Sequence, residues 1–416
     1  MRIGVRTSAP ATTIVLLLAI LVGCRADSSD SSGTPSGQAG PGSSVGSPDP
    51  TEPETSTPEP SEASGPPAID WEDPAPFDGQ PAEILVDGDA WIAVGWSRER
   101  GPGAWTSIDG VSWEAAEVVD PQPDDTFRGA GLGPTVRLGD TLLSYGTFVG
   151  CCDGRGIYAW RSAAGKSWEV LESDSPLFQT GYIVNELVVG DPALVAVEGR
   201  YAQYTGRIWR WTEDSSWVET TPGTAGTEES SGMATEDVAW GAGRYVVVGS
   251  RGDPAAPGPI AGASWTSTDG ETWEESAPAA ELEDVVLLEV ASTPGGGFVA
   301  LGVDDAANSG TADRPVSFTS PDGLSWTAVE TPAVGEFTRP HEVIPVEGGL
   351  VALLSEGAHT TVVWTSADGS TWTDAGRFES SPIAAASLDD TIIVIGADFE
   401  ADSDGGYVLH RGTLSR

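Results

Sequence analysis

Short apolar segments alternate with polar turns along most of this chain. From residue 68 onward, seven pairs of apolar segments flank turns rich in Gly and Asp, as in 84–94, where Asp87-Gly88 separates the two segments. No stretch of this region keeps a helical period, so the pattern predicts an almost entirely β structure made of hairpins. These inner hairpins begin at Ile84, Val136, Leu187, Val238, Val290, Val343 and Ala386.

A second unit, nine residues long, follows six of the inner hairpins. It consists of an aromatic residue, a polar turn and a Trp. Self-similarity at a period of about fifty residues indicates one supersecondary unit that is copied and stacked, and we expect the aromatic rings to pack between the copies. The copies begin at Trp105, Trp160, Trp209, Trp265, Phe318 and Trp364, and end at Trp113, Trp168, Trp217, Trp273, Trp326 and Trp372.

Four of the six copies contain the pattern Ser-x-Asp-Gly, with carboxylates at Asp109, Asp269, Asp322 and Asp368. This pattern resembles the Asp-box (BNR repeat) of the sialidase-like propellers, and the resemblance implies a β-propeller. An Asp at this place accepts hydrogen bonds from backbone N–H groups just ahead, and Gly supplies the positive φ of the turn. We therefore expect these carboxylates to form turns rather than to act as catalytic acids. The copy at 160–168 lacks the Asp, and the copy at 209–217 lacks the Gly.

Counting the two units predicts the number of blades. An inner hairpin and a boxed outer hairpin make a four-stranded blade, so seven inner hairpins and six boxes leave the seventh blade one strand short. The segment around Trp71 resembles the stretch that follows a box, and 407–412 is suited to be the strand beside it. We predict seven blades, the last closed by this N-terminal strand; six blades, the sialidase number, is the alternative.

The N-terminus predicts export and lipid attachment. Residues 1–23 contain Arg2, Arg6 and a short apolar run, as in a signal peptide. Leu21-Val22-Gly23-Cys24 resembles the bacterial lipobox, which implies that Cys24 is acylated and that the protein is anchored to the outer face of the cell membrane. Residues 24–67 are almost all small, polar or acidic and predict a disordered tether, which leaves 68–416 for the propeller.

The charge of the chain is strongly negative. It has 63 acidic and 20 basic residues, a formal net charge of −43. Such a surface repels nucleic acid and anionic lipid, so we expect neither as a direct partner. We expect a monomer that binds an extracellular protein or glycan and holds no cofactor other than, as a weak alternative, calcium.

In a propeller the box turns lie on one face, and we expect the ligand on the opposite face. The loops of that face are expected to contain Arg98, Arg100, Arg128, Arg155, Arg200, Arg251, Arg314, Arg339 and Arg377. Arg side chains around one opening favour an anionic ligand, whereas the alternative is pairing with neighbouring acids. No Arg-Ile-Pro motif of the sialidases occurs in the chain. We therefore favour a ligand-binding or scaffold module without catalysis, with a sialidase-like glycoside hydrolase as the alternative.

Two further motifs lie in these loops. Adjacent Cys151 and Cys152, in an oxidising compartment, favour a strained vicinal disulfide over free thiols or a metal site. Asp398, Glu400, Asp402 and Asp404 are spaced two apart and precede a Gly, which resembles the start of a calcium loop, although no Glu stands at its twelfth position.

Overall fold

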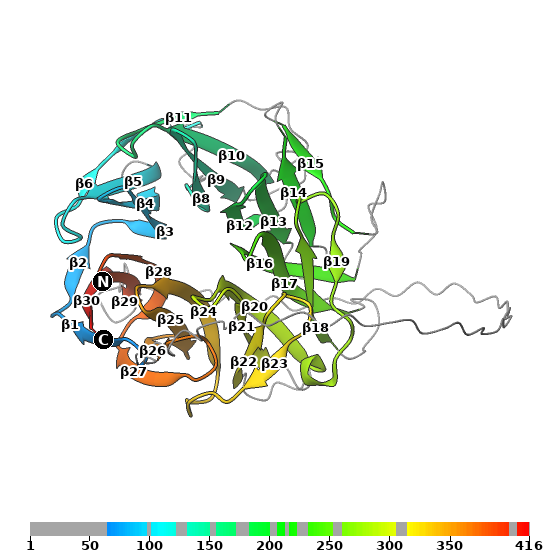
Figure 1. Cartoon of the computed structure of the whole chain (residues 1–416). Helices are drawn as coiled ribbons and strands as arrows, with labels where there is room; N and C mark the ends of the chain where they lie inside the picture. Colours follow the sequence, from blue (N-terminus) through cyan, green and yellow to red (C-terminus); the bar gives the residue numbers. More distant parts are fainter. Residues whose placement is uncertain are drawn as a thin grey trace, which may run out of the picture. The chain divides into compact units, whose positions relative to one another are not determined.

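The computed structural model describes residues 65–97, 101–121, 131–149, 155–171, 183–199, 206–212, 216–222, 232–252, 260–304, 314–398 and 406–415. These residues form seven sheets, almost entirely antiparallel, arranged as blades around a ring (Figure 1). The fold is a seven-bladed β-propeller, so the predicted blade number is confirmed and the six-bladed alternative is wrong. None of the described residues forms a helix long and apolar enough to cross a membrane.

Each blade places its first strand next to the central channel and its last strand at the rim (Figure 1). From the channel outward, blade 1 contains β3 (Gln80–Asp87), β4 (Ala90–Ser97), β5 (Gly101–Ser107) and β6 (Glu114–Ala115); blade 2 contains β8 (Thr135–Leu138), β9 (Thr141–Val149), β10 (Arg155–Ser162), β11 (Ser167–Val170) and β7 (Glu117–Val118); blade 3 contains β12 (Ile183–Val189), β13 (Leu194–Gly199), β14 (Arg207–Trp211) and β15 (Trp217–Glu219). Blade 4 contains β16 (Met233–Gly241), β17 (Arg244–Arg251), β18 (Ala261–Ser267) and β19 (Glu274–Glu275); after the 3₁₀ helix η2 (Ala280–Leu282), blade 5 contains β20 (Val285–Ser292), β21 (Phe298–Asp304), β22 (Arg314–Ser320) and β23 (Thr327–Val329). Blade 6 contains β24 (Thr338–Val346), β25 (Gly349–Glu356), β26 (Thr360–Ser366) and β27 (Thr373–Phe378), and blade 7 contains β28 (Ser381–Leu388), β29 (Thr391–Asp398), β30 (Gly406–Ser415), β1 (Ala68–Trp71) and β2 (Ala75–Phe77).

The N-terminal strand closes the ring, as predicted. Strand β1 pairs antiparallel with β30, with Trp71 opposite Gly412, and β2 pairs with the beginning of β30. The Trp71 ring meets the ring of Phe378 in blade 6 edge-on, with centroids 4.5 Å apart. Pairing the outer edge of β30 removes an open strand edge that could otherwise pair with another molecule.

The hydrophobic core consists of seven layers, one between each pair of neighbouring blades. Each of the seven clusters of buried apolar side chains draws its members from two consecutive blades. Some of the Trp residues that end a box also donate their indole N–H to the preceding blade: Trp326 to Ser264 Oγ at 2.9 Å, and Trp372 to Ser317 Oγ at 2.8 Å. Trp113 and Trp168 instead donate to a backbone oxygen of their own turn. The Trp repeat thus links several blades to the blade before them through side-chain hydrogen bonds.

The box carboxylates form turns. Asp109 Oδ1 accepts hydrogen bonds from the backbone N–H groups of Val111 and Ser112, at 2.9 and 2.7 Å, and these bonds hold the pKa of Asp109 below its usual range. Gly110 has a φ of 72°, and a Cβ there would lie 2.6 Å from Ile393 Cδ1 of blade 7. Asp269 and Asp322 accept the same pair of backbone bonds, whereas Asp368 accepts the N–H and the hydroxyl of Ser370.

The strand register separates the two faces of the ring. In blade 1, Trp91 at the start of β4 lies opposite Ser107 at the end of β5, so the inner hairpin turn and the box turn share one face. Gln80 at the start of β3 lies opposite Trp96 near the end of β4, so the remaining connections lie on the other. We call these the box face and the loop face.

Candidate functional site

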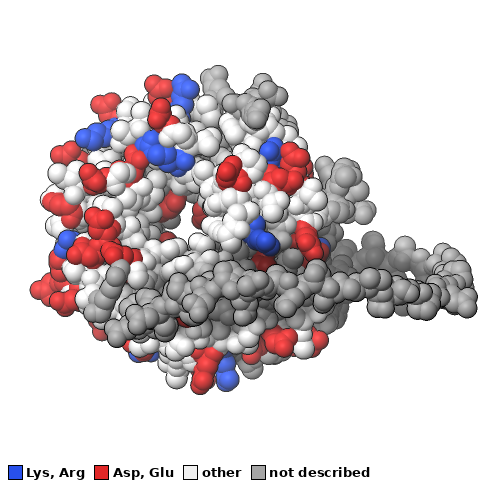
Figure 2. Space-filling model, viewed as in Figure 1, with Lys and Arg blue, Asp and Glu red and all other residues white. Residues whose placement is uncertain are grey.

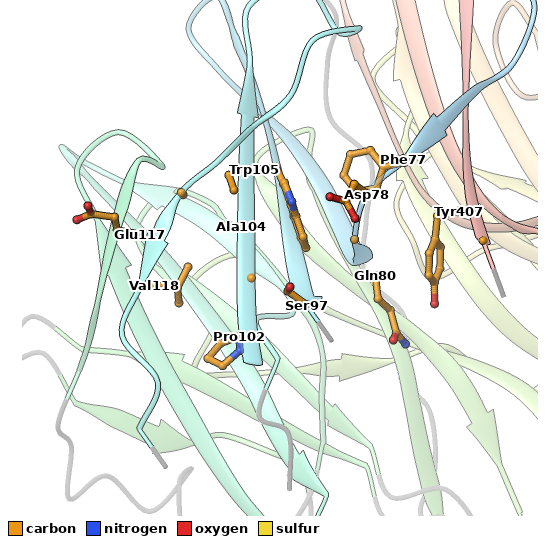
Figure 3. A pocket seen from close by; sticks show the side chains of 15 residues that line it. Phe77, Asp78, Gln80, Ser97, Pro102, Ala104, Trp105, Glu117, Val118 and Tyr407 are labelled. Carbon is orange, nitrogen blue, oxygen red and sulfur yellow. The ribbon is translucent and has the colours of Figure 1, made fainter. Parts of the chain in front are cut away.

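Two cavities open on the loop face. The first, the side cleft, has a volume of about 640 Å³ and lies where blade 1 meets blade 7 (Figure 3). The second, the channel cavity, comprises a mouth of about 640 Å³ and a deeper part of about 370 Å³, both lined by the innermost strands. The residues lining both come from strand ends that the register assigns to the loop face.

The side cleft combines an aromatic wall with a few polar groups. Trp105 is buried in it, and it packs so closely on Gly103 that a Cβ there would lie 2.7 Å from the indole Cη2. Phe77 meets Trp105 edge-on at 5.5 Å, and Tyr407 lies opposite Phe77 across the β2–β30 pair. In Figure 3 the polar ends of Gln80 and Tyr407 point in the same direction. Asp78, Ser97 and Glu117 complete the polar lining.

Cavities of this size that combine apolar walls with converging polar groups are a common form of small-ligand site, and the lining of the side cleft is about half polar and half apolar. The side cleft therefore has the chemistry to hold an uncharged ring or an extended apolar segment against Trp105 and to orient it through Gln80 and Tyr407.

Five carboxylates line the channel, one from each of five blades. Each follows an irregularity in the pairing of the two innermost strands of its blade, which turns the side chain toward the axis. The other two blades place no acid at this position. In blade 7 the corresponding residue is Ala384, and in blade 2 the innermost strand, β8, begins at Thr135. Figure 2 shows acidic side chains at the edge of the central opening. We call this set the channel ring: Glu83, Glu186, Asp237, Glu289 and Glu342.

Some of these carboxylates link neighbouring blades. Asp237 Oδ1 accepts the N–H of Val238 in its own strand at 2.6 Å, and Oδ2 accepts the N–H of Val290 in blade 5 at 2.7 Å. A backbone hydrogen bond from Ala385 of blade 7 likewise reaches Glu342. Beside the ring, the Asn185 amide donates to Thr235 O at 2.9 Å. The innermost strands are thus joined through side chains where they have no backbone pairing.

Burial and mutual repulsion keep protons on the ring. Burial, together with the nearby Asp237, raises the pKa of Glu186 to about 8. Burial and the charge of Glu186 raise the pKa of Glu342 to about 8, and burial raises that of Asp237 to about 7. The pKa values of Glu83 and Glu289 are also well above the usual range, through burial and then the charges of other ring members. The ring therefore holds both protonated and ionised carboxyls near neutral pH.

The mouth of the channel adds three more titratable groups. Burial raises the pKa of Glu236 to about 7, and the charge of Arg339 partly opposes this shift. Burial lowers the pKa of His341, so the imidazole of His341 is neutral at pH 7. Among the described residues that line the channel cavity, Arg339 is the one Lys or Arg.

The structure disperses the arginines expected on the loop face. Arg339 lines the channel mouth, whereas Arg251 pairs with Glu275 beside Trp265, and Arg377 pairs with Asp374 at 3.2 Å. Arg314 begins β22 with an exposed side chain, and the backbone of Arg155 begins β10. Arg98, Arg100, Arg128 and Arg200 lie outside the described residues. Within the described part of the chain, these arginines do not share a cavity.

The remaining sequence candidates lie largely outside the described residues. This holds for Cys24, Cys151, Cys152, Glu400, Asp402 and Asp404, while Asp398 ends β29. The lipid anchor, the vicinal disulfide and the calcium loop therefore stay predictions. In the ranges that the structure describes, no group of three or more His, Cys, Asp or Glu side chains could hold a metal ion.

Sequence reasoning missed the channel ring, although the repeat contains its signal. Each ring member comes one residue before the apolar segment that begins an inner hairpin: Glu83 before Ile84, and likewise Glu186, Asp237, Glu289 and Glu342 before Leu187, Val238, Val290 and Val343. Aligning the hairpins and moving back one position shows an acid in five of the seven copies.

Comparison with known proteins supports the fold. No family model and no curated protein sequence matches the chain. Among solved structures, YCF48 bound to D1 peptide is similar at a TM-score of 0.50 and 16% identity, over 84% of this chain and 98% of that one. The WD40 propeller of Doa1 gives 0.48 and 13% over 82% and 97%, and the phage phi92 endosialidase gives 0.45 and 9% over 85% and 70%. At 16% identity, the similarity to YCF48 shows the propeller fold alone.

Proposed function

We propose that this protein is a ligand-binding propeller without catalysis, anchored through a lipid on Cys24, that presents its loop face to an extracellular protein or glycan. The observation that carries the proposal is the position of the cavities: the side cleft and the channel cavity both open on the loop face. On the box face, the carboxylates of Asp109, Asp269 and Asp322 are engaged in their own turns.

The lining of the cavities favours a neutral or cationic ligand. Among the described residues, Asp78 and Glu117 are the charged ones that line the side cleft, and acids outnumber the single Arg339 in the channel cavity. An anionic ligand would be repelled there, because ionised carboxyls in a partly buried site are poorly screened. From the sequence, the Arg residues of the loops favoured an anionic ligand. Among the described residues, these loops place no Arg other than Arg339 in either cavity.

A sialidase-like glycoside hydrolase is the second candidate, and one observation favours it. The raised pKa of Glu236, about 7, at the channel mouth suits a general acid. Against it, the described lining of the channel contains no Tyr and a single Arg, whereas the sialidase resemblance implies a Tyr nucleophile and three Arg. In addition, neighbouring backbone N–H groups occupy both carboxylate oxygens of Asp237.

Binding to glycan and peptide arrays tests the proposal. We expect the full-length protein to bind a defined subset of probes, and Tyr407→Ala or Gln80→Ala in the side cleft to weaken that binding about tenfold, as truncation of a central contact does. Ile108→Ala is the matched control, because Ile108 is 87% exposed on a box turn. Binding that is lost in Ile108→Ala and kept in both cleft variants would contradict the proposal.

A further inference from the structure

The deeper channel cavity is lined by acceptors that the fold does not fully use. Its volume is about 370 Å³, and all five members of the channel ring line it. Hydrogen bonds from Thr135 of blade 2 reach the Glu83 carboxyl, yet Glu83 Oε2 is buried from solvent and has no hydrogen-bond partner. A buried acceptor without a donor destabilises the protein, whereas a bound donor would satisfy it.

We propose that the channel cavity binds a small organic polycation, a linear molecule with two or more protonated amines. The acceptors come from β3, β12, β16, β20 and β24, so they surround the axis of the ring instead of facing one point. One ammonium group has only three N–H donors and cannot reach acids on five blades. A chain of amines along the channel can donate to several of them, and charge-assisted bonds of this kind are the stronger ones.

The spacing of the ring disfavours a single metal ion. A metal ion needs several oxygen ligands at about 2–2.6 Å from one centre. The described residues contain no group of three or more His, Cys, Asp or Glu that could provide them. The acids of the channel ring are too dispersed to bind one ion, but they still raise one another's pKa across the channel. This arrangement matches a longer ligand with separated charges.

The groups around the cavity determine how binding depends on pH. The ring members face one another from five strands, with Asn185 on β12, Glu236 on β16, and Arg339 and His341 on β24 at the mouth; β28 contributes Ile383 and Ala384. The terminal primary amines of such a polycation stay protonated to about pH 10. A polycation therefore binds best when the carboxyls of the channel ring have lost their protons. On binding, it displaces the protons that remain on these carboxyls. The affinity for the polycation consequently increases between pH 6 and pH 8.5.

Calorimetry with spermidine tests the inference. For the full-length protein at constant ionic strength we expect saturable binding at pH 8.5, at least about tenfold weaker binding at pH 6.0, and release of protons, measured by comparing two buffers of different ionisation heat. n-Butylamine, with one amine, should bind at least about tenfold more weakly than spermidine.

Variants test whether the ring itself is the site. Glu83→Gln and Glu289→Gln should each weaken spermidine binding about tenfold, whereas Glu274→Gln, which removes the same charge from an exposed residue at the rim, should leave it unchanged. If neither ring variant folds, the proton release of the wild-type protein decides. Absent or pH-independent spermidine binding, equal loss in the rim control, or preference for an oligolysine peptide over spermidine would overturn the proposal.

This inference is independent of the side cleft. Tyr407→Ala, which tests the proposed function, should keep full spermidine affinity, because Tyr407 does not line the channel cavity. Loss of spermidine binding in Tyr407→Ala would contradict the channel site and leave the array result for the cleft unaffected.

Discussion

Among single residues, the glycines of the box turns have two separate roles. Gly110 adopts a positive φ of 72°, and a Cβ there would lie 2.6 Å from Ile393 Cδ1 of blade 7, so the Ile393 side chain would have to shift. Gly323 repeats this arrangement against Val246 of blade 4, at 2.5 Å from Cγ2. The box therefore fixes its own turn and, through the missing side chain, the spacing of two blades.

Replacing two glycines separates these roles. Gly88 in the inner hairpin turn has a φ of 60°, but a Cβ there would have no neighbour within 4 Å. We expect Gly88→Ala to lower the free energy of unfolding by about 1 kcal/mol through backbone strain alone. Gly110→Ala should cost about 2–3 kcal/mol, because overpacking adds to the strain. Urea unfolding measures both, and equal losses would show that the contact with Ile393 does not matter.

Among the elements, the strand that closes the ring connects the two ends of the propeller sequence. Trp71 of β1 lies half-buried between β30 and Phe378, and a Cβ on Gly412 would lie 2.8 Å from the Trp71 ring. Pairing segments so distant in sequence closes a long loop, which costs conformational entropy that the contacts of β1 must offset. The closing strand therefore holds the first and last parts of the propeller sequence together in one blade.

Trp71→Ala tests the closing strand. We expect the free energy of unfolding to fall by about 2–4 kcal/mol and the protein to aggregate more readily on warming, since β1 would detach and expose the edge of β30. Val218→Ala on the rim strand β15 is the control, because Val218 is 47% exposed and should change stability by less than about 0.5 kcal/mol. Light scattering during a thermal melt measures both effects, and similar curves for the two variants would refute the closing role of Trp71.

The sequence predicts the elements better than it predicts the site. Apolar pairs, boxes and the segment at Trp71 are local patterns, so the blade number and the closure follow from counting them. The channel ring depends on an irregularity in each innermost ladder, as between Leu287 and Glu289, and alternation along a strand does not indicate which side chain faces the axis. The parallel pairing of β7 with β11 likewise has no signal in the repeat.

At the scale of the whole molecule, the propeller encloses acids in its channel and must keep some of them protonated. The folded state raises the pKa values of Glu186, Asp237 and Glu342 to between about 7 and 8, far above those of the unfolded chain. At any pH between the pKa of these carboxyls in the unfolded chain and their pKa in the folded protein, the folded protein binds more protons than the unfolded chain. The stability that this protonation provides is therefore lost as the pH rises through 7 to 8. Burial lowers the pKa of His341 and that of His410, which acts in the opposite sense, but only below about pH 6.5.

We therefore expect the free energy of unfolding to fall by roughly 1–2 kcal/mol between pH 6.5 and pH 8.5, with solvent screening taken into account. Glu186→Gln combined with Glu342→Gln should flatten this slope, whereas Glu274→Gln at the rim should preserve it and so control for the net charge of the chain. Denaturant unfolding at a series of pH values provides the measurement. Stability that rises with pH over this range would be inconsistent with a protonated ring.

A panel of fluorogenic glycosides that includes a sialoside is the decisive test of the claim that the loop face binds a ligand without converting it. We expect no turnover above the uncatalysed rate by the full-length protein at any pH from 5 to 8. We also expect no difference between the wild type and Glu236→Gln, in which the most suitable general acid at the channel mouth is removed. Clear turnover that disappears in Glu236→Gln, while the melting temperature of that variant stays the same, would contradict the claim and identify the channel mouth as an active site.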